Sequence, residues 1–136
     1  MSNIEQTLSI IKPDAVERKL QDQIKTEFKN KGFEIVKEKK LHISKDEAEK
    51  FYKVHESKPF YNDLCTYLSS GPIVVMILEK EDAVLANRKL MGATNPKEAD
   101  EGTIRKKYGI SIDKNSVHGS DSVENAKIEI DFFFKD

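Results

Sequence analysis

Six consecutive apolar residues, Ile73-Val74-Val75-Met76-Ile77-Leu78, restrict the possible folds of this chain more than any other feature of its sequence. The run is shorter than a typical helix and is rich in β-branched side chains, which favour strands. No polar side chain alternates with the apolar ones, so neither face of this strand is expected to meet water. We therefore predict a central, fully covered strand.

The rest of the chain alternates between segments typical of strands and segments typical of helices. We expect further strands at residues 7–11, 33–43 and 115–118, and helices at residues 20–31, 45–55, 59–68, 82–90 and 122–133. This order contains the β-α-β-β-α-β core of a ferredoxin-like fold, an antiparallel sheet with helices on one face. We therefore predict an α/β (α+β) sandwich with a four-stranded antiparallel sheet and extra helices.

Polar residues mark where several of these helices begin. Ser44-Lys45-Asp46-Glu47 has the pattern of a capping box. Asp82 and Ser122 can cap the helices that follow them, and Pro59 can open another. After Met91 the helical pattern ends for about twenty residues, and a loop of that length in a compact domain is usually functional or mobile.

Length and charge narrow the classes of function. The 136 residues suit one domain, residues 1–136. Lys and Arg (23) nearly balance Asp and Glu (24), so no overall field attracts nucleic acid or an anionic membrane, and an anion site needs a local cluster of cations. The single cysteine, Cys65, excludes an internal disulfide. We see neither a secretory signal nor an apolar run of membrane-spanning length, and we expect a cytoplasmic protein.

The densest polar segment is Asn115-Ser116-Val117-His118-Gly119-Ser120-Asp121-Ser122. Its histidine is expected at the end of a strand, just before a helix begins. Histidine can act as a nucleophile toward phosphorus. A lone histidine near a turn is more often structural, so on these grounds both interpretations of His118 stay open. His42 and His55 have no polar cluster around them and are expected to be structural or solvated.

Glu129 favours the catalytic interpretation of His118. It lies next to Ala126 and Ile130 in the predicted last helix, near the inward face. A carboxylate there needs a partner, because burying a bare charge is costly. An imidazole N–H would serve, and such a bond would fix the tautomer and free the other ring nitrogen to attack. Spacing alone also allows an ordinary exposed glutamate.

Three basic residues, Lys12, Arg88 and Arg105, are candidates for holding phosphates. Lys12 follows an apolar strand directly, and Arg105 lies in the irregular loop. Each has the alternative of a solvated surface position, where most basic residues lie. The chain has neither G-x-x-x-x-G-K-[ST] nor G-x-G-x-x-G, and no cluster with zinc spacing. Side chains would therefore have to hold the phosphates.

The segment around His118 matches N-x-x-H-G-S-D-S, the active-site signature of the nucleoside diphosphate kinase family, which the chain resembles over nearly its whole length. The other matching segments are residues 7–15, 71–72, 87–94, 102–105 and 132–134. The resemblance implies a ferredoxin-like fold. It also implies a phosphotransferase that moves the γ-phosphate of a nucleoside triphosphate, typically ATP, to a nucleoside diphosphate in a ping-pong reaction.

The resemblance also implies roles for single residues. His118 is the nucleophile that becomes phosphohistidine, and Glu129 and Ser120 orient and support it. The remaining matched residues contact the nucleotide: Lys12, Arg88, Thr94 and Arg105 at the phosphates with Tyr52 beside them, Phe60 stacked on the base with Leu64 and Ile112 around it, and Asn115 with Lys12 at the ribose hydroxyls.

The family likeness further implies a metal and an assembly. Mg²⁺ is expected to arrive bridging the nucleotide phosphates, without a protein ligand. A homo-oligomer is expected, a hexamer rather than a tetramer, because the chain ends soon after Phe134. The sequence departs from the family at Glu17-Arg18-Lys19-Leu20-Gln21-Asp22, where family members usually carry a glycine-bearing turn, and at Asp100-Glu101, where they usually have a proline.

Two other functions fit the same fold. A ferredoxin-like sheet can bind single-stranded nucleic acid by stacking, but the chain has no concentrated basic stripe. A catalytically silent oligomeric module is the second alternative. The intact set of matched site residues argues against it.

Overall fold

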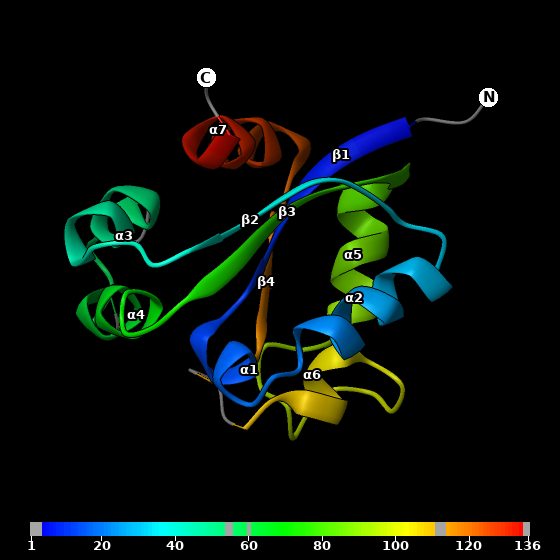
Figure 1. Ribbon diagram of the computed structural model, residues 1–136, viewed down its shortest axis with the longest axis horizontal. Helices are drawn as coiled ribbons and strands as arrows, with labels where there is room; N and C mark the ends of the chain where they lie inside the picture. Colours follow the sequence, from blue (N-terminus) through cyan, green and yellow to red (C-terminus); the bar gives the residue numbers. More distant parts are fainter. Residues whose placement is uncertain (1–3, 54–55, 60, 111–113, 135–136) are drawn as a thin grey trace.

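The computed structural model describes residues 4–53, 56–59, 61–110 and 114–134 (Figure 1). The elements in chain order are β1 (Ile4–Ile11), α1 (Pro13–Glu17), α2 (Gln21–Asn30), β2 (Glu34–Leu41), α3 (Lys45–Phe51), α4 (Tyr61–Leu68), β3 (Ile73–Glu81), α5 (Ala83–Met91), α6 (Ile104–Tyr108), β4 (Val117–Gly119) and α7 (Val123–Phe134). The four strands form one antiparallel sheet in the order β2-β3-β1-β4. His55, Phe60 and Ile112 lie outside the described residues.

The apolar run forms most of β3, which lies between β2 and β1 in the sheet. All six residues from Ile73 to Leu78 are buried. Alternate side chains enter two separate cores, with Val74 and Met76 on one face and Val75 and Ile77 on the other. The prediction of a central strand covered on both faces is confirmed.

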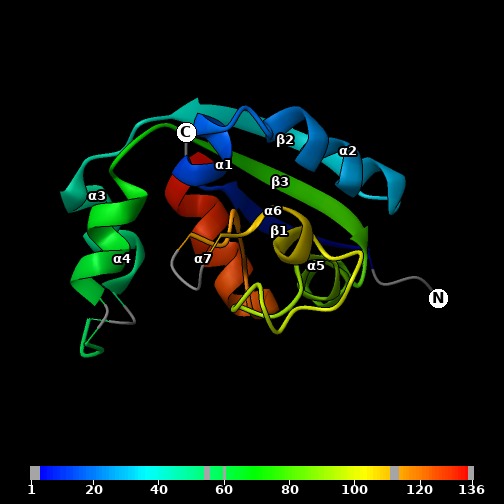
Figure 2. The same ribbon diagram turned by 90° about the horizontal axis from the view of Figure 1, so that it is seen from below.

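Helices cover both faces of the sheet, so the expectation of helices on one face alone was wrong (Figure 2). The crossover helices α2 and α5 pack on the face of Met76, together with Ile104 of α6. The opposite face packs against α3, α4 and α7 through Ala48, Leu68 and Phe133. These three helices are additions to the β-α-β-β-α-β core.

The helix starts follow the predicted caps with one exception. Ser44 and Glu47 form the complete capping box of α3. Ser122 Oγ accepts a hydrogen bond from the Asn125 N–H at 3.1 Å, at the start of α7. Asp82 makes no side-chain cap for α5, and its backbone instead adopts a left-handed conformation, with φ 51°, that turns the chain out of β3. The prediction of an Asp82 cap was therefore wrong.

Two short helices escaped sequence prediction. The five residues of α1 directly follow β1, with Pro13 in the first turn. The five residues of α6 lie inside the segment expected as a loop, and Thr103 caps them. A helix of five residues is too short for apolar periodicity to appear. Within the described part of the chain, no helix has both the length and the apolar character needed to cross a membrane.

Candidate active site

His118 lies in the middle of the three-residue strand β4, opposite Ile10 of β1. Its Nε2 is 2.9 Å from Oε1 of Glu129 on α7. A carboxylate only accepts hydrogen bonds, so in the neutral imidazole this contact places the ring proton on Nε2. No described residue hydrogen-bonds to Nδ1, which therefore keeps its lone pair for another partner.

Ser120 hydrogen-bonds to the same carboxylate. Its hydroxyl donates to Glu129 Oε1 at 3.1 Å, and its backbone N–H donates to the Leu8 carbonyl at 3.2 Å. Ser120 is fully buried, whereas the Glu129 side chain is 17 % exposed. Two donors thus meet at one carboxylate oxygen, which fixes the carboxylate and the imidazole relative to β1.

Aromatic rings close one side of the imidazole. The Phe51 ring, at the end of α3, meets the His118 ring edge to face with centroids 5.4 Å apart, and Tyr52 does so at 6.2 Å. Burial, and then the nearby charge of Glu129, raise the pKa of the Tyr52 phenol far above its ordinary value, so this hydroxyl stays protonated. Phe51 was missed as a site residue, because its place in the apolar stripe of α3 indicates only packing.

Arg105 of α6 reaches the first residue of β4. Its Nη1 donates to the Gly92 carbonyl and its Nη2 to the Val117 carbonyl, each at 3.0 Å. Burial lowers the pKa of the guanidinium to about 10, with the charge of Arg88 acting in the same direction and Tyr52 against it. Arg105 therefore remains a cation near neutral pH, fixed beside the residue that precedes His118.

Lys12, directly after β1, and Asn115, two residues before β4, form a second polar pair of the site. Lys12 Nζ donates to Asn115 Oδ1 at 2.9 Å, and Asn115 Nδ2 donates to the Thr94 carbonyl at 3.1 Å. Lys12 and Asn115 are only 5 % and 2 % exposed. The backbone adds a bond from the Lys12 N–H to the Ser116 carbonyl at 2.8 Å. The end of β1 is thereby tied to the segment that leads into β4.

The other predicted site residues lie on the surface, pack against the core or fall outside the described residues. Arg88 is exposed on α5 and shares a surface hollow with Asp82 and Asp121. Thr94 is exposed and enters the network through its carbonyl rather than its hydroxyl. Leu64 is half-buried and packs against the core on its side of the sheet. Phe60 and Ile112, expected around a base, fall outside the described residues.

The donor groups of this site suit an anion rather than a bare cation. Arg105 is bound to the residue that precedes the histidine, Lys12 and Asn115 form a pair in the segments next to β1 and β4, and no three His, Cys, Asp or Glu side chains of the described residues gather as a metal site. Planar guanidinium and ammonium groups are the usual partners of phosphate oxygens. A histidine with a fixed tautomer beside such cations is the arrangement of a phosphotransferase that uses a covalent intermediate.

Comparison with known proteins agrees with this chemistry. The sequence model of the family described as "Nucleoside diphosphate kinase" matches residues 5–136. The chain is 56 % identical over 131 residues to a nucleoside diphosphate kinase of Geotalea uraniireducens, covering 96 % of each chain. It is 59 % identical over 132 residues to one from Campylobacter jejuni, covering 97 % of this chain and 96 % of the relative.

Solved structures show the same likeness. The fold matches the Aquifex aeolicus nucleoside diphosphate kinase with a TM-score of 0.96 at 39 % identity, covering 98 % of this chain and 96 % of that one. The Encephalitozoon cuniculi enzyme matches with a TM-score of 0.93 at 40 % identity, covering 97 % and 90 %. The chain belongs to the nucleoside diphosphate kinase family, which confirms both the resemblance and the ferredoxin-like fold.

Proposed function

We propose that this chain moves the γ-phosphate of a nucleoside triphosphate to a nucleoside diphosphate through Nδ1 of His118. The observation that carries the proposal is the 2.9 Å contact between His118 Nε2 and Glu129 Oε1, which leaves Nδ1 as the nucleophile. Family membership supports the reaction, and one domain over residues 1–136 would carry it out. The nucleic-acid-binding and silent-module alternatives are not favoured by the family comparison.

The first half-reaction forms one N–P bond and breaks one P–O bond. The Nδ1 lone pair attacks the γ-phosphorus, and the bridging oxygen leaves with the nucleoside diphosphate. The resulting phosphohistidine carries extra positive charge on the ring, which the Glu129 carboxylate offsets through Nε2–H. In the second half, an oxygen of the acceptor's terminal phosphate attacks the phosphorus and returns Nδ1 to its free state.

Positioning and charge neutralisation supply most of the catalysis in such a transfer. We assign the phosphate contacts to Arg105, Arg88, Lys12 and Thr94, and the ribose contacts to Asn115 with Lys12. The fixed guanidinium of Arg105 and the buried Lys12 ammonium support these roles. Phe60, with Leu64 and Ile112, would hold the base.

The substrate would be a nucleotide that carries a divalent cation, and we propose Mg²⁺. The cationic and amide groups of the site do not suit a protein-held metal, so the ion would enter on the β- and γ-phosphates and leave with them. There it would offset phosphate charge that Arg105 and Lys12 also face.

Mass spectrometry of the protein treated with ATP and Mg²⁺ alone tests this function. We expect one added phosphate per chain, located on His118, labile to acid and lost when ADP is added. Full transfer activity in His118→Ala, or transfer only when both nucleotides are bound together, would rule out the proposed reaction.

We also propose that the chain forms a homo-oligomer, a hexamer rather than a tetramer. Two large apolar side chains are exposed, Ile4 of β1 at 60 % and Ile128 of α7 at 66 %, and they support association between chains. A mass of six chains by light scattering in solution is the expected result. A mass of four would contradict it. The cytoplasmic location stays a prediction of the sequence.

A further inference from the structure

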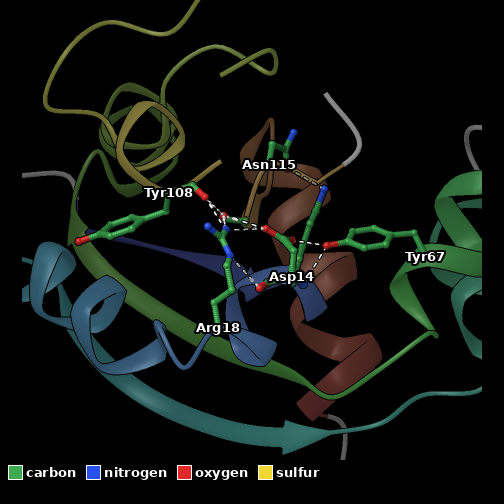
Figure 3. Close-up of polar contacts among 7 residues, drawn as sticks. Asp14, Arg18, Tyr67, Tyr108 and Asn115 are labelled. Carbon is green, nitrogen blue, oxygen red and sulfur yellow. Dashed lines mark hydrogen bonds and ion pairs between the residues drawn. The ribbon is translucent and has the colours of Figure 1, made fainter. Parts of the chain in front are cut away.

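Asp14, in the first turn of α1, is a buried carboxylate that binds the end of its own helix and groups from two other parts of the chain (Figure 3). The Tyr67 hydroxyl, from α4, donates to Asp14 Oδ1 and accepts from the Asp14 N–H at 2.9 Å. Ser116 Oγ lies 2.9 Å and Arg18 Nη2 lies 3.1 Å from Asp14 Oδ2. We call these four residues the Asp14 hub.

The hub extends to the end of α6. Ser116 Oγ lies 3.0 Å from the Tyr108 carbonyl, and Arg18 Nη2 donates to that same carbonyl. Arg18 Nη2 also lies 3.1 Å from Ser116 Oγ. A carboxylate whose side chain is 3 % exposed thus has a cation and two hydroxyls around it, and buried charge needs such partners.

Ser116 adopts a backbone conformation that side chains disfavour. Its φ is +75°, in the left-handed region, which is sterically unfavourable for a non-glycine residue. Residues held in this way persist only when their surroundings fix them. The Oγ contacts to Asp14, Arg18 and Tyr108 supply that fixation, and they set the direction in which the chain passes from Asn115 into β4.

The hub is adjacent in sequence to both members of the second polar pair of the site. Asp14 lies two residues after Lys12, and Ser116 directly follows Asn115. Lys12 Nζ and Asn115 Oδ1 meet at 2.9 Å across a sequence separation of 103 residues. The Asp14–Ser116 contact spans a separation of 102 residues and is a second link between the same two segments.

We propose that the Asp14 hub positions Lys12 and Asn115 for the ribose of the nucleotide, with Tyr67 as its anchor on α4. Asp14 and Tyr67 are positioning residues, since they act through Lys12 and Asn115. The inference rests on the proposed function, because it assigns the ribose subsite of that same site. Sequence reasoning missed the hub because Asp14, Tyr67 and Ser116 lie far apart in the sequence.

Discrimination between ATP and 3′-deoxy-ATP separates a positioning role from a merely structural one. The ratio of the two kcat/KM values reports contacts to the 3′-hydroxyl, and a uniform loss of folded protein cancels from it. The test variant is Tyr67→Phe, which removes one hydroxyl. The matched control is Tyr61→Phe, because Tyr61 is also on α4 and its hydroxyl donates to the Glu49 carbonyl at 2.9 Å, away from the hub.

We expect Tyr67→Phe to reduce the ATP preference roughly tenfold, the scale of a sub-ångström misplacement of contact groups. Tyr61→Phe should keep the wild-type ratio. His118 of both variants should still take up phosphate from ATP. An unchanged ratio in folded Tyr67→Phe would overturn the inference, as would a wild type that uses both nucleotides equally well.

Ser116→Gly keeps the inference testable if Tyr67→Phe fails to fold. Glycine accepts positive φ without steric strain, so the backbone path is retained while the hydroxyl is lost. Its ATP preference should fall to a similar extent, and a wild-type ratio would contradict the proposal. If wild-type protein takes up no phosphate on His118, the proposed function itself fails, which is a different result from an unchanged ratio.

Discussion

At the scale of single residues, one carboxylate oxygen organises the nucleophile. Glu129 Oε1 meets both His118 Nε2 and Ser120 Oγ. The serine hydroxyl holds the carboxylate, and the carboxylate holds the ring. The bond between His118 and Glu129 was accessible from the sequence because Glu129 lies on the inward face of α7. The contact with Phe51 was not, because it depends on how α3 lies against β4.

Loss of His118 should differ in kind from loss of Glu129. His118→Ala should remove transfer almost entirely, while nucleotide binding persists through Arg105 and the other contacts. Glu129→Gln should lower kcat by a smaller factor, roughly ten- to a hundredfold, because it loosens the ring without removing the nucleophile. Steady-state transfer assays and ATP titrations measure both effects. Glu124→Gln, exposed on the same helix, serves as the control and should behave as wild type.

Two neighbouring cations on α6, Arg105 and Lys106, should contribute very unequally to kcat/KM. Arg105→Ala should reduce kcat/KM roughly a hundredfold, since it removes a fixed charge that we propose faces the developing transition state. Lys106→Ala, one residue further and exposed, should change it little. The two kcat/KM values measured side by side give the comparison. A larger loss in Lys106→Ala would show that the phosphates bind elsewhere.

At the scale of elements, the turn between α1 and α2 carries backbone strain at Lys19, in the segment where the family resemblance leads us to expect a glycine. Lys19 adopts φ 60°, and its N–H donates to the Val16 carbonyl at 2.9 Å in a tight helix end. Left-handed backbone at the end of a helix is the position that glycine usually occupies. Lys19 thus holds a backbone conformation that side chains disfavour.

Replacing this lysine by glycine should stabilise the fold. Lys19→Gly removes a steric cost of about 1–2 kcal/mol and loses about 0.5–1 kcal/mol to greater unfolded-state entropy. The net gain of up to about 1.5 kcal/mol should raise the urea midpoint. Lys31→Gly is the matched control. Lys31 ends α2 with φ −96°, so glycine there should lower the midpoint. A fall in both variants would show that Lys19 is not strained.

The elements themselves were predictable to the extent that local pattern defined them. The apolar run defined β3, and the Ser44 box defined the start of α3. Asp82 looked like a cap because its side chain suits that role, yet the short connection from β3 required a left-handed turn. Tertiary packing determines the short helices α1 and α6, and it also determines that α3, α4 and α7 cover the second face of the sheet. The local sequence pattern does not encode this packing.

At the scale of the whole molecule, the site collects residues from β1, the segment after α5, α6, β4 and α7. Arg105 binds carbonyls of Gly92 and Val117, and Asn115 binds Thr94, so the segment around α6 is attached to the sheet. Their positions in the sequence indicated Lys12 and Arg105 separately as candidate phosphate-binding residues. Only the signature around His118 linked them, because neither residue lies near the histidine in the sequence.

Substrate choice is a property of this whole arrangement. The charged groups are proposed to bind the phosphates and the ribose, and stacking is proposed as the main contact of the base, which every base allows. Purine and pyrimidine triphosphates should therefore all act as donors, with kcat/KM values within roughly a hundredfold of one another. Parallel assays with ATP, GTP, CTP and UTP measure this spread. A preference for one base by several further powers of ten would contradict stacking as the main contact.

The sheet order has a consequence for synthesis of the chain. β1 lies between β3 and β4, and its residue Ser9 pairs with Met76 on one side and with Gly119 on the other. While the ribosome is still adding residues beyond α6, the first three strands can pair, but the second edge of β1 stays uncovered. Open strand edges invite association between chains. We expect nascent protein in this interval to be inactive and open to association between chains until β4 pairs with β1 and brings His118 into place.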